Sequence, residues 1–96
     1  MTDNSETIIQ ELYDLILSRR ENPVEGSYTN YLFTKGNDKI CKKAGEEAIE
    51  VIIAATHGSK QDTIYELADL HYHLLVLMAA NGITPDEVYK ELKNRR

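Results

Sequence analysis

The chain has no tryptophan, a single phenylalanine, two prolines and one cysteine among its 96 residues. The lone Cys41 cannot form a disulfide within the chain, and its neighbours do not have the spacing of a zinc site. Cysteine usage therefore fits a reducing compartment. Because Cys41 falls on an apolar helix face with no histidine near it in the sequence, we expect a small core residue and not a nucleophile.

Basic residues and long apolar runs are also scarce. Eleven Lys and Arg residues stand against 16 Asp and Glu residues, which gives a net charge of −5. Without a basic field the chain cannot attract a phosphate backbone, which argues against a nucleic-acid-binding protein. The start, MTDNSETIIQ, lacks the features of a signal peptide, and no stretch free of ionisable residues is long enough to span a membrane. We expect a cytoplasmic protein with no membrane partner.

The sequence does contain apolar residues spaced three and four apart, and it lacks strand-like alternation. This pattern predicts a helix in residues 4–20, with Ser5 as its N-cap. Pro23 and Gly26 end that helix, and residues 28–36 can form two further helical turns.

Two long helices are predicted next. One runs from about residue 39 to residue 57, capped by Asp38 and closed by Gly58. After the short connection SKQD, the other starts at Asp62 or Thr63 and ends near the sequence NG.

The C-terminal sequence TPDEVYKELKNRR predicts a last helix. Thr84 serves as its cap, Pro85 takes its first position, and Glu87 completes a capping box. The prediction is an all-α protein, a bundle of three to five helices in one domain covering residues 1–96, with antiparallel neighbours where loops are short.

The chain is short for a stable core of its own. Ile49 and Ile53 form a second apolar patch on the far side of their helix, opposite its main apolar face. We therefore expect a homodimer that assembles into a larger helical bundle.

Carboxylates interrupt the most apolar helix of the chain. From Ile64 to Ala80, 13 of 17 residues are apolar or tyrosine. Such a helix is expected to be buried. Glu66, Asp69 and His73 share a stripe about 60° wide on its helical wheel, because they are three and four residues apart.

The preceding helix supplies the opposite half of a cleft. Its apolar face consists of Ile40, Cys41, Ala44, Ala48, Val51, Ile52 and Ala55. Glu47 lies at the edge of this face, and Glu50 follows one turn along. Antiparallel packing of the two helices would place the motif E-x-x-E, at Glu47 and Glu50, opposite the motif E-x-x-D, at Glu66 and Asp69.

Four carboxylates in one partly buried cleft repel one another. Two such charges about 5 Å apart cost roughly 3 kcal/mol at an effective dielectric near 20. Divalent cations relieve this repulsion, and oxygen ligands favour Mg²⁺, with Mn²⁺ as a possible substitute. Such ions commonly bind phosphates in enzymes.

Simpler interpretations stay open for these residues. Glu46, Glu47 and Glu50 could be good helix formers on a solvated face. His73 fits a hydrogen-bonding partner of a ligand, or a satisfied core histidine, better than a metal ligand.

The motifs carry a family resemblance. The segments SYTNYLFTKG, KICKKAGEEAIEVIIAA, YELADLHYHLLVLM and GITPDEVYKEL are similar to those of the phosphoribosyl-ATP pyrophosphohydrolase family of histidine biosynthesis. This family lies within the all-α nucleotide pyrophosphohydrolase (MazG-like) superfamily. The resemblance covers residues 27–96 and extends weakly into the first helix.

The resemblance implies hydrolysis of N1-(5-phosphoribosyl)-ATP, a small-molecule nucleotide, to phosphoribosyl-AMP and pyrophosphate. It implies Mg²⁺ ligands at Glu47, Glu50, Glu66 and Asp69. Glu46 or one of the ligand carboxylates, Glu47 or Glu50, would accept a proton from water. Substrate contacts are implied at Ser27, Tyr28, Thr29, Lys35, Lys39 and Lys43.

Two other functions compete with this one. A housecleaning pyrophosphohydrolase acting on noncanonical nucleoside triphosphates would use the same metal cleft. A non-catalytic helical module would use the carboxylates to bind a basic partner, and Mg²⁺ dependence separates it from the enzymes.

Overall fold

The computed structural model describes residues 7–96, and within that range it contains five α-helices and no strand. This confirms the all-α prediction. The helices are α1 (Ile8–Glu21), α2 (Tyr28–Lys35), α3 (Asn37–His57), α4 (Lys60–Ala80) and α5 (Pro85–Lys93).

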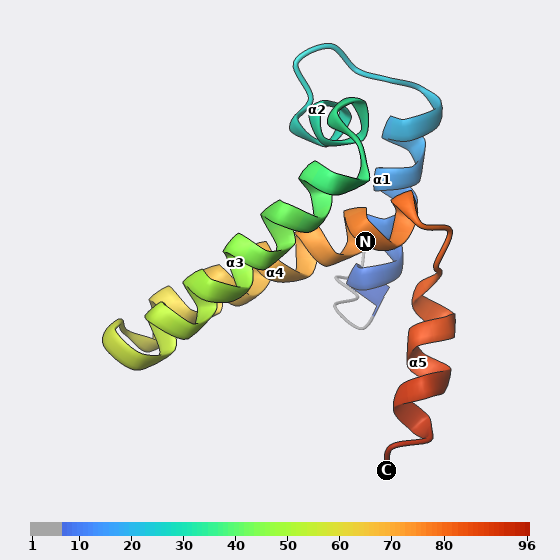
Figure 1. The fold of residues 1–96 in the computed structure, drawn as a ribbon. Helices are drawn as coiled ribbons and strands as arrows, with labels where there is room; N and C mark the ends of the chain where they lie inside the picture. The colour runs from blue at the N-terminus through green and yellow to red at the C-terminus, as the bar shows by residue number, and fades with distance from the viewer. Residues whose placement is uncertain (1–6) are drawn as a thin grey trace, which may run out of the picture.

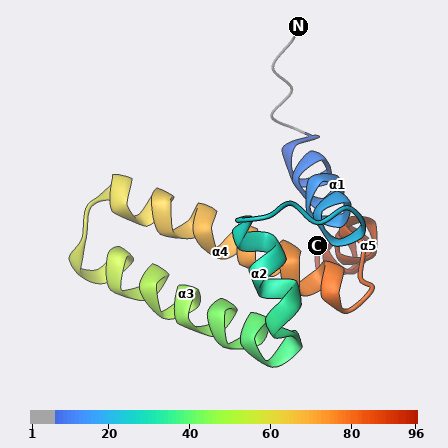
Figure 2. The same ribbon diagram turned by 90° about the horizontal axis from the view of Figure 1, so that it is seen from above.

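Helices α3 and α4 form a long antiparallel hairpin that projects from the rest of the molecule (Figure 1). Helix α2 lies against the start of α3, and α1 packs beside the C-terminal half of α4 (Figure 2). The core lies at this base of the hairpin. Its buried apolar side chains are Tyr13, Ile16, Leu32, Ile40, Leu75, Val76 and Ala79.

A single glycine joins α2 to α3. Gly36 is both the C-cap of α2 and the N-cap of α3. Its φ of 92° lies in a region where residues other than glycine are strained. The turn lets α3 begin at Asn37, so Asp38 lies inside the first turn and the prediction that Asp38 caps this helix is wrong. Ser5, predicted to cap the first helix, lies outside the described residues.

Helix α4 begins earlier than predicted. Ser59 accepts a hydrogen bond from the Asp62 backbone N–H, and the Asp62 carboxylate accepts one from the Ser59 N–H, both at 3.1 Å. This capping box starts the helix at Lys60, not at Asp62 or Thr63. The capping box predicted at Thr84 and Glu87 is confirmed.

The outer part of the hairpin exposes apolar side chains. Ile52 is 62% exposed, and Tyr65 is 70% exposed. The prediction of a helix buried all round is therefore wrong for the first half of α4 within one chain, because α1 and α2 pack only against the base of the hairpin. Cys41 is also exposed, which contradicts its predicted place in the core. In residues 7–96, no helix combines the length and the apolar character that a membrane span requires.

Candidate metal and substrate site

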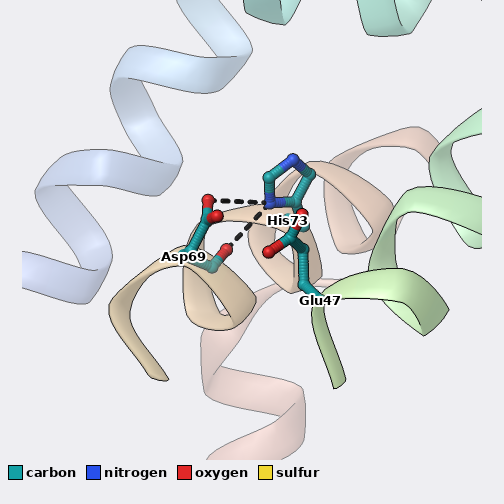
Figure 3. Close-up of side chains that lie close together, drawn as sticks. All are labelled: Glu47, Asp69 and His73. Atoms are coloured by element: carbon teal, nitrogen blue, oxygen red, sulfur yellow. Dashed lines mark hydrogen bonds and ion pairs between the residues drawn. The ribbon is translucent and has the colours of Figure 1, made fainter. Parts of the chain in front are cut away.

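Glu47 of α3 and Asp69 and His73 of α4 point toward one another between the two long helices (Figure 3). One potential ligand atom from each lies within 4.8 Å of the others. Glu47 and His73 are buried, at 8% and 4% exposure, and Asp69 is half-buried. The antiparallel packing thus places two carboxylates and an imidazole in one sheltered cluster.

His73 connects this cluster to α2. Its Nδ1 lies 2.8 Å from the Asp69 carbonyl oxygen and 3.3 Å from Asp69 Oδ1. Its Nε2 lies 2.8 Å from the Tyr28 hydroxyl. The sequence pattern placed His73 on the carboxylate stripe but could not show the link to Tyr28.

The pKa of Glu47 is raised above its ordinary value. Burial is the main cause, and a hydrogen bond to the Asp69 carboxyl and the charge of Asp69 add to it, while His73 and Lys43 oppose it. The ionised form of Glu47 is therefore disfavoured in the folded chain. A cation bound beside the two carboxylates would reverse this preference.

Lys43 stands one turn before Glu47 on α3. Its Nζ lies 3.7 Å from Glu47 and 3.5 Å from Glu46. Burial alone would lower the pKa of Lys43, but the neighbouring Tyr28, Glu46 and Glu47 outweigh burial and raise it. The ammonium group thus keeps its charge at the edge of the cluster.

Tyr28 borders the same region from α2. Its pKa is raised, mainly by burial of the hydroxyl; Lys43 opposes this rise, while Asp69 and Glu47 contribute to it. The residue as a whole remains 45% exposed. Tyr28 therefore has its hydroxyl in the charged site and its ring toward solvent.

Glu50 and Glu66 lie further along the hairpin. Both line a cleft of about 250 Å³ that extends toward the turn at Gly58. In the described chain, the group close enough to share one ion consists of Glu47, Asp69 and His73, so Glu50 and Glu66 lie outside it. The four predicted ligands thus form two pairs along the seam, the interface between α3 and α4. Glu47 and Asp69 form one level of this seam, and Glu50 and Glu66 form the other.

An open hollow of about 710 Å³ lies beside Tyr28. The loop from Pro23 to Gly26 and the side chains of Tyr28 and Tyr31 line it. The two tyrosine rings are stacked, with centroids 6.1 Å apart. This surface offers aromatic faces next to the charged cluster.

The other predicted substrate residues differ in their surroundings. Ser27 caps α2 by accepting a hydrogen bond from the Asn30 N–H at 3.3 Å. Thr29 is buried, and its hydroxyl is hydrogen-bonded to that of Tyr72. Of the three adjacent residues, Tyr28 is the one whose side chain lines the hollow and also meets the cluster.

The remaining lysines lie toward the start of α3. Lys35 is exposed near the end of α2, with its Nζ 5.7 Å from the centre of the Tyr31 ring. Lys39 is half-buried and precedes Lys43 by one helical turn. Glu46 is exposed, with half of its side-chain surface open to solvent.

The donor set of this seam fits a divalent cation. Its donors are carboxylate oxygens, which suit Mg²⁺ and Mn²⁺. The unfavourable ionisation of Glu47 beside Asp69 is the kind of strain that a cation relieves. The residues that could hold an ion are Glu47 and Asp69, beside His73, and further along the hairpin Glu50 and Glu66.

Comparison with known proteins shows the family to which the chain belongs. Residues 9–96 match the family described as Phosphoribosyl-ATP pyrophosphohydrolase. The chain is 55% identical over 89 residues to a phosphoribosyl-ATP pyrophosphatase from Pelotomaculum thermopropionicum, covering 93% of this chain and 91% of that relative.

Longer relatives contain a similar segment. The chain is 53% identical over 94 residues to a histidine biosynthesis bifunctional protein from Caldanaerobacter subterraneus subsp. tengcongensis, covering 98% of this chain and 46% of the relative. A bifunctional protein of the same description from Thermoanaerobacter pseudethanolicus is 58% identical over 84 residues, which cover 88% of this chain and 39% of the relative. The chain spans less than half the length of these two proteins.

Proposed function

Because the chain belongs to the phosphoribosyl-ATP pyrophosphohydrolase family, we propose that it hydrolyses N1-(5-phosphoribosyl)-ATP to phosphoribosyl-AMP and pyrophosphate in histidine biosynthesis. The observation that carries this proposal is the cluster of buried Glu47 and half-buried Asp69, with Lys43 at its edge. A triphosphate needs both cation-binding carboxylates and a nearby positive side chain, and this seam supplies both.

Glu47, Glu50, Glu66 and Asp69 would hold Mg²⁺, or Mn²⁺ in its place. When bound, the metal would neutralise charge on the triphosphate and lower the pKa of a water molecule. Glu50 and Glu66 are included because both line one cleft, which residues of α3 and α4 form near the hairpin turn.

Side chains around the seam would orient the substrate and move the proton. Lys43 would contact phosphate oxygens, with Lys39, one helical turn before it on α3, and Lys35 at the end of α2 as further contacts. Glu46 would accept the proton of the attacking water, because its carboxylate is exposed to solvent beside Lys43. Glu47 or Glu50 is the alternative acceptor.

The nucleoside end of the substrate would lie over the hollow beside α2. Tyr28 presents a half-exposed ring there. Ser27 and Thr29 would act mainly by shaping α2, because one caps the helix and the other bonds to Tyr72. This arrangement would place the triphosphate toward Lys43 and the carboxylates.

A homodimer would cover the exposed part of the hairpin. Three isoleucines on α3 are each about half or more exposed: Ile49, Ile52 and Ile53. Ile64 and Tyr65 on the facing helix are exposed as well. Self-association buries such a surface without a second protein, and a cytoplasmic location fits the exposed free thiol of Cys41.

Release of pyrophosphate from phosphoribosyl-ATP, with Mg²⁺ and with EDTA, tests the function directly. We expect Mg²⁺-dependent release and little turnover of noncanonical nucleoside triphosphates. Preferential turnover of those triphosphates would favour a housecleaning enzyme. Absence of any hydrolysis with either substrate class, from a folded protein, would favour a non-catalytic helical module.

A further inference from the structure

His73 lies between two parts of the proposed site that come from different helices. It is 4% exposed, so its ring is enclosed by protein. One ring nitrogen meets Asp69 at 2.8 and 3.3 Å, and the other meets the Tyr28 hydroxyl at 2.8 Å. A buried histidine needs partners for both ring nitrogens, and here both partners are residues of the proposed site.

The partners of His73 determine the direction of its hydrogen bonds. Nδ1 faces the carbonyl oxygen of Asp69, which can only accept, so Nδ1 carries the proton. In the neutral ring Nε2 is then an acceptor, and the Tyr28 hydroxyl donates to it. The Tyr28 oxygen can still accept a hydrogen bond, and the charge of Lys43 acts on it.

Ring packing holds the imidazole in this orientation. The Tyr28 ring meets His73 edge to face, with centroids 5.6 Å apart and planes at 73°. The Tyr72 ring does the same at 6.1 Å and 80°. Tyr72 also bonds to Thr29, so two successive residues of α2 are tied to two successive residues of α4.

We propose that His73 is a positioning residue, which fixes the Tyr28 phenol beside the hollow and the Asp69 carboxylate at the seam in one mutual arrangement. The inference rests on the proposed function, because it concerns how the nucleoside end and the phosphate end of one substrate are aligned. Loss of the link to Tyr28 would leave the carboxylates in place but let the phenol turn away. The expected effect is on substrate binding more than on the chemical step.

Two substitutions at His73 separate its two bonds. In His73→Asn the amide can still donate near the Nδ1 position but does not reach Tyr28. In His73→Gln the longer amide places an oxygen near the Nε2 position, where it can accept from Tyr28. We expect His73→Asn to raise KM for phosphoribosyl-ATP about tenfold, the effect of losing one hydrogen bond, with kcat changed by less than about threefold. His73→Gln should restore most of the loss in KM.

Tyr28→Phe removes the other partner. It should raise KM by a similar factor, and the double variant Tyr28→Phe, His73→Asn should be no worse than either single variant. His71→Asn is the matched control, because its Nδ1 makes the same kind of bond, 2.7 Å to the Leu67 carbonyl, on the exposed side of α4. Wild-type KM in both His73 variants, or additive effects in the double variant, would overturn the inference.

A spectroscopic measurement keeps the inference testable without turnover. Long-range ¹⁵N–¹H correlation spectra should show His73 with its proton on Nδ1, and Tyr28→Phe should shift the Nε2 resonance alone. A proton on Nε2 would overturn the inference even if His73→Asn failed to fold. Failure of the proposed function would appear differently, as a wild-type protein that releases no pyrophosphate from phosphoribosyl-ATP.

Discussion

Glu47 of α3 and Asp69 of α4 place carboxyl oxygens within 4.8 Å of each other in a region where Glu47 is almost fully buried. The pKa of Glu47 is raised, first by burial and then by Asp69. The folded chain therefore carries an unfavourable interaction at the place where the proposed substrate needs a cation. Four testable predictions follow from this site and from the exposed hairpin.

Glu47→Gln should stabilise the protein in the absence of divalent ions. The amide keeps the size of the side chain but removes its charge next to Asp69. Lys43 and His73 offset part of the repulsion in the wild type, so we expect a gain of roughly 1 kcal/mol, equivalent to about 4–8 °C in Tm for a chain of this size. Thermal unfolding in EDTA measures it. Glu46→Gln is the control, since Glu46 is exposed and should change Tm little.

The stability difference between wild type and Glu47→Gln should depend on pH. Above the ordinary pKa of 4.5, Glu47 has lost its proton in the unfolded chain but keeps it in the folded chain until the raised pKa is passed. The folded state binds more protons in that interval, so this group makes stability fall as pH rises. Above the raised pKa the cost stays constant. Urea unfolding in EDTA at several pH values from about 4 to 8 should show the difference widening and then levelling. A difference independent of pH would contradict the raised pKa.

The pairing of Glu47 with Asp69 was predictable from the sequence. The two motifs sit on helices joined by a short connection, and antiparallel packing brings them together. Burial of Glu47 was less predictable. The helical wheel placed Glu47 at the edge of the apolar face. In the structure Glu47 is itself among the buried residues of α3, which are Ile40, Ala44, Glu47 and Ala54. Because α3 carries isoleucines on more than one side, its sequence alone does not show which side meets α4.

Neither the contacts of α2 nor the first residue of α4 could be predicted from the sequence pattern, for different reasons. The bond between Tyr28 and His73 joins residues far apart in the chain, so it depends on tertiary packing that no local spacing encodes. The capping box at Ser59 uses Asp62 where Glu is the commoner partner, so the signal was weak. Ser27 and Thr29 matched a family motif, but only the structure reveals that they stabilise α2.

Ile52→Glu should convert a homodimer to a monomer. Ile52 is 62% exposed in the single chain, so a charged side chain there should not disturb the monomer fold. In a dimer that covers the hairpin, the same charge would be buried and unpaired, which is strongly unfavourable. Light scattering coupled to size exclusion should give about twice the chain mass of 10.9 kDa for wild type and the single mass for the variant.

Leu92→Glu provides the control for that experiment. Leu92 lies on α5 and is 56% exposed, so it tests an apolar-to-charged change away from the hairpin. Dissociation by Leu92→Glu in place of Ile52→Glu would put the dimer interface on α5. A wild-type protein that is monomeric at all concentrations would contradict the proposed homodimer itself.

Loss of one carboxylate from either pair of proposed ligands should weaken Mg²⁺ binding. Asp69→Asn removes the carboxylate beside Glu47, and Glu66→Gln removes one of the two that line the cleft with Glu50. Each substitution changes the side-chain volume little. For the wild type, Mg²⁺ at one hundred times its dissociation constant should add about 2.7 kcal/mol to the free energy of unfolding. Both variants should lose most of this gain and release pyrophosphate about 10²–10³-fold more slowly, since a ligated metal contributes several kcal/mol to such reactions. Calorimetric titration with MgCl₂ and the pyrophosphate assay measure the two effects.

Glu91→Gln is the control. Glu91 lies on α5 and pairs with Arg95, so its substitution should leave Mg²⁺ binding and pyrophosphate release unchanged. If Asp69→Asn alone were defective, the ion would be held by the buried cluster only, and Glu50 and Glu66 would not be ligands.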